Sequence, residues 1–154
     1  LIEADPEHAE GYRARAESYL AELDALDAWV REQFETVPQP QRVIITSHDA
    51  FNYFGQAYGV EVHGVVGIST EQQAGPGDIA RLEAMVRDRG VRAVFIETSV
   101  VQTLNTLVEQ IAQETGVSIG GSLYSDSLGK PDTDAGTYIG MIRHNTTTIV
   151  EALR

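Results

Sequence analysis

Four short apolar runs, each followed by a segment with helical periodicity, make up the chain after residue 40. The runs fall near residues 43–46, 62–66, 92–96 and 117–123, and the helical segments near 49–58, 76–89, 100–115 and 136–153. Gly59, Gly90 and Gly116 follow three of these helical segments, where a glycine cap is common. The repeated alternation predicts an α/β fold with a four-stranded parallel, doubly wound sheet, flanking helices and right-handed crossovers.

One long helix is predicted before the sheet. Apolar residues recur at helical spacing from Tyr12 to Phe34, Asp5 and Pro6 are typical of a helix start, and Pro38 ends the pattern. Some 29 residues would form a helix roughly 43 Å long, whereas about 30 Å crosses a small domain. The helix should therefore overhang its own domain. Its overhanging apolar stripe either rests on a second lobe or pairs with its copy in a dimer.

The chain therefore divides into a long linking helix, residues 1–37, and an α/β lobe, residues 38–154. The sequence begins at Leu1 without an initiator methionine, directly before a helix start. We expect that upstream residues were removed and that an N-terminal lobe is absent from this chain.

Composition excludes several classes of function. The 154 residues, 42% of them hydrophobic, suit one compact domain, and the formal net charge of -12 repels nucleic acids and anionic membranes while attracting metal cations. The absence of cysteine removes disulfides, thiolate metal sites and cysteine nucleophiles. The apolar runs are far shorter than the roughly 20 residues of a membrane-spanning helix.

Three of the four apolar runs are followed at once by a side chain that can bind a metal. His48 follows the first run, Glu97 the third and Asp126 the fourth, whereas the second is followed by Gly67-Ile68-Ser69. Because parallel strands bring their carboxyl ends to one edge of a sheet, these three side chains should converge there. One imidazole and two carboxylates suit a divalent cation of intermediate hardness.

Each of these residues also has an ordinary explanation. His48 could be a surface histidine at a strand-to-helix turn, Glu97 an acceptor for nearby hydroxyl or backbone donors, and Asp126 a turn residue between two serines. The other histidines are expected to be structural or exposed, with His63 inside the second strand and His8 and His144 on helices.

The segments around these residues resemble a known family. Residues 46–54 and 57–59 are similar to the "HdAFxYFaxxYG" signature of solute-binding proteins that deliver manganese, zinc or iron to ABC importers. Residues 94–100 resemble that family's "FxESSV" segment and residues 123–129 its "LxxDSLG" segment, and residues 138–153 are also similar. The resemblance covers nearly the whole chain.

This resemblance implies a two-lobed binding protein whose lobes are joined by one long helix, with the metal in the cleft between them. His48, Glu97 and Asp126 would then be the ligands from the C-terminal lobe, and a further histidine would come from the N-terminal lobe. Two carboxylates favour manganese, with zinc or iron as alternatives. The implied partners are the metal ion, the ABC permease and the other lobe. Family members are exported, often as lipoproteins.

Three other functions remain open. A hydrolase could use Ser47, His48 and Asp126, although a G-x-S-x-G elbow is absent and Ser47 adjoins His48 in sequence. Glycine-rich segments at residues 64–70 and 120–122 could bind phosphate, but neither matches a dinucleotide or Walker motif. An adhesin-like interaction module is the third. The Gly- and Asp-containing segment 127–136 beside Asp126 is the part we expect to move.

Overall fold

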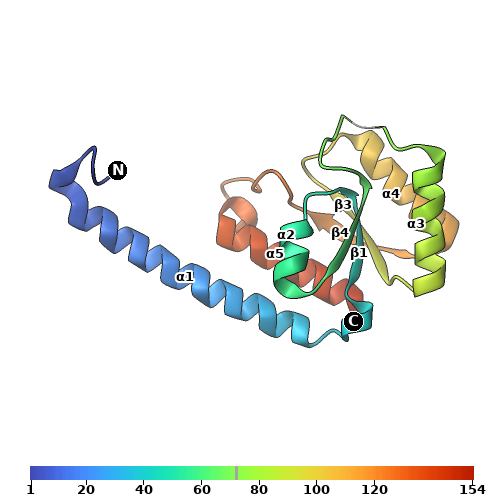
Figure 1. Ribbon diagram of the computed structural model, residues 1–154, viewed down its shortest axis with the longest axis horizontal. Helices are drawn as coiled ribbons and strands as arrows, with labels where there is room; N and C mark the ends of the chain where they lie inside the picture. Colours follow the sequence, from blue (N-terminus) through green and yellow to red (C-terminus); the bar gives the residue numbers. More distant parts are fainter. Residues whose placement is uncertain (72) are drawn as a thin grey trace.

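The computed structural model, which describes residues 1–71 and 73–154, contains a four-stranded parallel sheet (Figure 1). The strands are β1 (Val43–His48), β2 (Glu61–Val66), β3 (Ala93–Glu97) and β4 (Ser118–Leu123), arranged in the order β2-β1-β3-β4. Each neighbouring pair is parallel. The predicted fold class is therefore confirmed.

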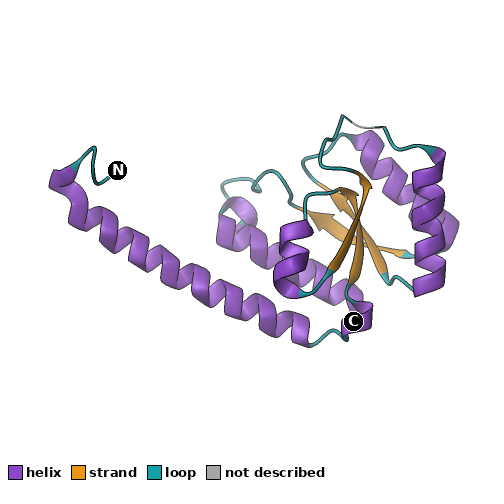
Figure 2. Ribbon diagram, viewed as in Figure 1, coloured by secondary structure: helices purple, strands orange, loops and turns teal. Residues whose placement is uncertain are grey.

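Helices cover both faces of the sheet (Figure 2). They are α2 (Asn52–Tyr58), α3 (Pro76–Arg89), α4 (Gln102–Thr115) and α5 (Tyr138–Leu153), with short 3₁₀ turns at Pro6–His8, Gln39–Gln41 and Asp134–Gly136. Successive strand residues point to opposite faces, so Ile44 and Phe95 pack with α5 and the long helix, whereas Ile45 and Val94 pack with α3 and α4. The two apolar clusters make the sheet doubly wound, as predicted.

Glycines end three of the helices in the left-handed conformation. Gly59, Gly90 and Gly116 follow α2, α3 and α4 with φ of 68°, 62° and 75°. Each backbone N–H donates to a carbonyl in the last turn of its helix, which satisfies one of the orphaned acceptors there. These predicted helix ends are confirmed.

The long N-terminal helix α1 (Ala9–Glu35) is also present. Its buried residues, Leu26, Val30 and Phe34, all lie near its C-terminal end, and its N-terminal half projects away from the sheet (Figure 1). Asp5 precedes the first turn as predicted, but it caps no backbone N–H. Its carboxylate instead accepts a hydrogen bond from the hydroxyl of Tyr12 at 2.8 Å. The division of the chain into a linking helix and a lobe stays a prediction.

The helix after β1 begins later than its sequence pattern indicates, at Asn52. Residues 49–51 form a turn in which the N–H of Asp49 donates to Gly67 and that of Ala50 to the carbonyl of His48, at 3.3 and 3.1 Å. This turn holds His48 at the last position of β1 and directs the chain away from the sheet edge.

Candidate metal centre

The candidate site lies where the winding of the sheet reverses, between β1 and β3. From β1 the chain passes through α2 to β2 at one edge, and from β3 it passes through α4 to β4 at the other. Open α/β sheets bind ligands beside the carboxyl ends of the strands at such a switch point. His48 ends β1, Glu97 ends β3, and Asp126 follows β4 in a loop.

The imidazole of His48 contacts both carboxylates. Its Nδ1 atom is 2.8 Å from Oε2 of Glu97, and its Nε2 atom is 3.0 Å from Oδ2 of Asp126. The backbone N–H of His48 also donates to Oε1 of Glu97 at 2.8 Å. Three strands that are separate in sequence thus place the three predicted residues next to one another.

The burial of His48 argues against a surface histidine, whereas one oxygen of Glu97 does accept from a backbone donor, as its ordinary explanation expects. His48 is 2% exposed and Glu97 1%, so neither is a surface residue. Although Nδ1 of His48 and Oε2 of Glu97 are close, their geometry does not make a hydrogen bond, and both are buried without another partner among the described residues. A buried carboxylate oxygen without a donor is energetically costly, and coordination of a cation would remove that cost. The chemistry of this donor set, one imidazole and two carboxylates, therefore suits a cation.

The three side chains do not surround a single point. Among the described residues, no group of three or more His, Asp or Glu side chains is arranged so that it could hold an ion as it stands. Glu97 and Asp126 approach different nitrogens of the His48 ring, which lie on different edges of the imidazole. A shared ion would require the ring to turn or Asp126 to shift. The role of these residues as metal ligands stays a prediction.

Asp126 differs from the other two residues in exposure. Its side chain is 61% exposed, and its backbone N–H donates a long hydrogen bond of 3.4 Å to the hydroxyl of Ser99. The Ser99 hydroxyl also pairs with that of Ser125. Asp126 is therefore the carboxylate best placed to move toward or away from an ion.

Sequence reasoning missed two buried asparagines that support the strand ends. Asn105 of α4 forms hydrogen bonds with the backbone of Glu97, and Asn145 of α5 does the same with the backbone of Tyr124. The available signal was an asparagine at a buried position of an amphipathic helix, because such an amide needs partners within the core.

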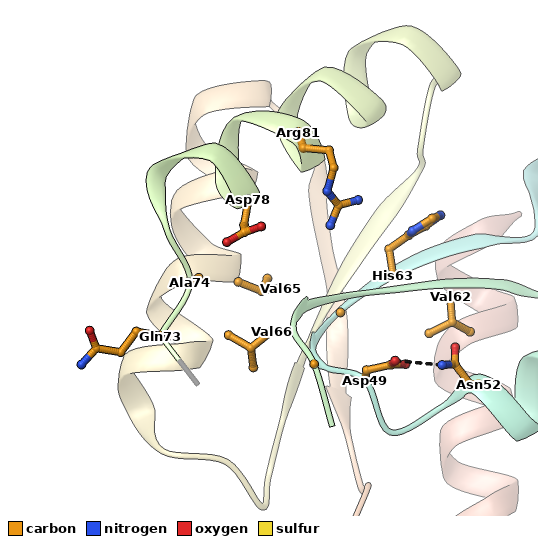
Figure 3. Close-up of a pocket in the computed structure, with 12 residues that line it drawn as sticks. Asp49, Asn52, Val62, His63, Val65, Val66, Gln73, Ala74, Asp78 and Arg81 are labelled. Atoms are coloured by element: carbon orange, nitrogen blue, oxygen red, sulfur yellow. Dashed lines mark hydrogen bonds between the residues drawn. The ribbon is translucent and has the colours of Figure 1, made fainter. Parts of the chain in front are cut away.

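A cavity of about 560 Å³ lies beside β2, and none of the three proposed ligands is among the described residues that line it (Figure 3). Asp49, whose carboxylate accepts from Asn52 at 2.8 Å, lines it together with Asp78 and the exposed Arg81. The two carboxylates disfavour phosphate in this cavity. The side chains that line this cavity therefore give little support to the phosphate-binding alternative.

One glycine in each of the two segments considered for phosphate binding has a packing role. A Cβ atom at Gly64 would lie 2.5 Å from the carbonyl oxygen of Val66, and one at Gly120 would lie 2.6 Å from Cβ of Ala152. Glycine is needed at both positions because neighbouring groups approach the backbone closely. This accounts for both glycines without a ligand.

Among the described residues, the other three histidines have partners other than the three proposed ligands. His8 is exposed, His63 contacts Glu61 at 2.8 Å, and His144 lies near the carbonyl oxygen of Ser122 at 3.0 Å. The guanidinium of Arg89 and then His63 lower the pKa of Glu61 to about 2. The Glu61 cluster is thus an ion-pair network on the edge strand β2.

The chain matches the family model described as "ZnuA: Zinc-uptake complex component A periplasmic" over residues 1–152. The match includes the whole sheet, the long helix and the three proposed ligands. The chain therefore belongs to this family of metal-binding solute-binding proteins, and the resemblance seen in its motifs is confirmed.

Similar proteins agree with this assignment. The manganese-binding lipoprotein MntA of Bacillus subtilis (strain 168) is 44% identical over 154 residues, 98% of this chain and 50% of that protein. The manganese ABC transporter substrate-binding lipoprotein PsaA of Streptococcus anginosus is 31% identical over 153 residues, 99% of this chain and 48% of that protein. The chain spans about half the length of the curated relatives it matches.

A solved structure shares the whole fold. The periplasmic zinc-binding protein TroA from Treponema pallidum superposes with a TM-score of 0.92 and 40% sequence identity, covering 99% of this chain and 56% of that one. No helix in the described part of the chain combines the length and the apolar character needed to cross a membrane.

Proposed function

We propose that this chain is part of the substrate-binding component of an ABC importer, which captures a divalent transition metal and delivers it to the membrane permease. His48, Glu97 and Asp126 are the proposed ligands of the transported ion. The observation that carries the proposal is the buried imidazole of His48 in contact with two carboxylates at the switch point of the sheet. The names of MntA and PsaA, both manganese proteins and both lipoproteins, support it.

Manganese is the favoured ion. Two carboxylates and one imidazole form a harder ligand set than one rich in histidine, and hard ligands suit manganese and iron more than zinc. The similarity to TroA, named as a zinc-binding protein, keeps zinc as an alternative beside iron. Zinc binds most such sites more tightly than manganese by intrinsic affinity, so selectivity has to be measured in competition.

The proposed ligands would contribute differently to capture and release. His48 and Glu97 are fixed at the ends of β1 and β3, and the N–H of His48 holds one oxygen of Glu97. Asp126 approaches from an exposed loop. We expect the two strand residues to form a preorganised half-site and Asp126 to close on the ion last and leave first. The segment 127–136 would move with it.

The partners of the whole protein follow from the same proposal. They are the transported ion, the ABC permease and an N-terminal lobe that supplies a further histidine, and the protein is exported to the periplasm or to the cell surface as a lipoprotein. We propose a binding protein and not an enzyme, because the hydroxyl of Ser47 donates to Oδ1 of Asn105 at 2.6 Å and is therefore not available as a nucleophile for His48. The adhesin alternative has no comparable observation in its favour.

Metal binding by the complete gene product that contains residues 1–154 tests this proposal. The protein is stripped of metal and titrated with Mn²⁺, Zn²⁺ and Fe²⁺, as wild type and as His48→Ala. His144→Ala is the matched control, because His144 is exposed and contacts Ser122 and Tyr124, neither of which is a proposed ligand. We expect tight binding that is lost in His48→Ala and kept in His144→Ala. Equal binding by both variants, or no binding by the wild type, would overturn the proposal.

A further inference from the structure

The backbone of Glu97 lies where β1 and β3 separate. In the described part of the chain, these two strands pair at one register position, Ile45 opposite Val94, well before their carboxyl ends. The N–H of Thr98 donates to Leu123 of β4 at 3.0 Å. Because successive strand residues direct their backbone groups to opposite sides, the N–H and C=O of Glu97 face β1.

The side-chain amide of Asn105 takes the place of the missing strand pairing. Its Oδ1 atom accepts from the N–H of Glu97 at 3.0 Å, and its Nδ2 atom donates to the C=O of Glu97 at 2.9 Å. The same Oδ1 atom accepts from the hydroxyl of Ser47 on β1 at 2.6 Å. Asn105 is 7% exposed, so these bonds form within the core. One side chain thus joins the ends of both strands.

These contacts close a ring of interactions around the candidate centre. Asn105 holds the backbone of Glu97, the Glu97 carboxylate accepts from the N–H of His48, and His48 follows Ser47, which donates back to Asn105. The ring fixes both the main chain and one carboxylate oxygen of Glu97. It leaves Oε2 as the oxygen facing the imidazole.

We propose that Asn105 is a positioning residue for the metal centre, which sets both the affinity for the ion and the preference between manganese and zinc. This proposal rests on the proposed function. Asn105 keeps Glu97 and His48 in a fixed relative orientation before the ion arrives, so that binding does not have to order them. A fixed spacing of ligands also selects among ions, because manganese and zinc prefer different coordination numbers and geometries.

Asn145 repeats this arrangement beside the other carboxylate. Its Oδ1 atom accepts from the N–H of Tyr124 at 2.9 Å, and its Nδ2 atom donates to the C=O of Tyr124 at 2.7 Å. Tyr124 follows β4 directly and lies two residues before Asp126. Both strand ends that carry a proposed acidic ligand are therefore held by an asparagine from the following helix. Of these two asparagines, Asn105 binds the backbone of a proposed ligand, Glu97, whereas Asn145 binds the backbone of Tyr124.

Substitution of Asn105 in the complete gene product tests the proposal. We expect Asn105→Ala to weaken Mn²⁺ and Zn²⁺ binding by about 10- to 100-fold, as is typical for residues that orient metal ligands, and to change the ratio of the two affinities. The visible absorption spectrum of bound Co²⁺, which reports ligand geometry, should also change. Affinities are measured by competition with a chelator at a temperature where each variant is folded.

Val108→Ala is the matched control. Val108 is fully buried one turn further along α4 and packs in the apolar cluster between the sheet, α3 and α4. Its truncation should therefore destabilise the fold but leave the hydrogen bonds around Glu97 intact. We expect this variant to keep the wild-type metal affinity and Co²⁺ spectrum despite a lower melting temperature. If both variants lose stability but bind both ions like the wild type, Asn105 is merely structural and the inference is wrong.

If Asn105→Ala does not fold, Ser47→Ala tests whether Asn105 positions the metal ligands. This change removes one hydrogen bond to Asn105 and leaves both bonds to Glu97. We expect a smaller loss of affinity, about threefold to tenfold, with a change in the Co²⁺ spectrum in the same direction. Wild-type affinity in Ser47→Ala would overturn the inference. Absence of metal binding by the wild type would instead overturn the proposed function together with this inference.

Discussion

The backbone N–H of His48 donates a hydrogen bond of 2.8 Å to Oε1 of Glu97, so the main chain of one proposed ligand orients the side chain of another. The contact joins the last residues of β1 and β3, which are 49 positions apart in sequence. It holds one oxygen of a buried carboxylate and leaves the second oxygen beside the imidazole. Two predictions about the centre follow from this geometry, and two more follow from the packing of α1 against α2.

Glu97→Gln should weaken metal binding without destabilising the fold. The amide keeps the shape of the side chain and an oxygen that can accept from the N–H of His48, but it removes a buried negative charge. We expect metal affinity to fall by more than about 100-fold, beyond the loss typical of residues that only orient a ligand. The metal-free protein should melt at the same or a higher temperature. A variant that melts much lower would contradict this account of the carboxylate.

Asp126→Asn should mainly accelerate metal release. Asp126 is largely exposed and lies in a loop, so its charge contributes little to folding but is placed to close on the ion. We expect a higher dissociation rate in stopped-flow chelator experiments, with the free energy of unfolding of the metal-free protein changed by less than about 0.5 kcal/mol. Asp132→Asn, an exposed change in the same connection, is the control and should leave the rate unaltered.

Phe34→Ala should detach the long helix from the α/β lobe. Phe34 is buried at the end of α1, with its ring edge-to-face with Phe54 at 5.8 Å and stacked with Tyr58 at 6.3 Å. Truncation of such a ring costs about 3–5 kcal/mol. Tyr19→Ala, on the exposed part of α1, should cost less than about 0.5 kcal/mol. Urea unfolding followed by circular dichroism measures the free energy of unfolding of both variants. If the two substitutions destabilised the protein equally, the asymmetric packing of α1 would be contradicted.

Tyr58→Phe should reduce stability in a manner that depends on pH. Burial and the hydrogen bond to Asp27, 3.0 Å long, raise the pKa of Tyr58 to about 12. The protonated phenol therefore stabilises the fold fully below pH about 10, and this contribution is lost as the pH rises from about 10 to 12. At pH 8 we expect the free energy of unfolding of the wild type to exceed that of Tyr58→Phe by up to about 2 kcal/mol. Unfolding curves at pH 8 and pH 11 should show this difference shrink.

Most of the fold could be predicted from the sequence, because its signals are local. Apolar runs, helical spacing and the glycines at positions 59, 90 and 116 each act within a few residues, and all three glycines adopt the expected left-handed conformation. The start of α2 was misplaced for a non-local reason. The turn before it is set by a hydrogen bond from Asp49 to Gly67, on a different strand connection.

The candidate centre was predicted only in part, again for physical reasons. Placement of His48, Glu97 and Asp126 at one edge follows from parallel strand topology, which the alternation of elements indicates. The orientation of the His48 ring between the two carboxylates depends on side-chain torsions that no sequence pattern encodes. The contribution of Asn105 depends on where β1 and β3 separate, which is a property of sheet twist.

In the described part of the chain, the buried residues of α1 all lie near its C-terminal end, so this helix can act as a lever. Its hold on the lobe is reinforced by Asp27, which accepts from Tyr58, and by Arg31, which donates to the carbonyl oxygen of Ala57. From Leu26 to Ala9 the free arm measures about 25 Å, so a tilt of about 10° at the attachment displaces the far end by about 4 Å. Small repacking events around the aromatic rings of α2, which is close in sequence to His48, would thus displace the N-terminal end of α1 by a larger amount.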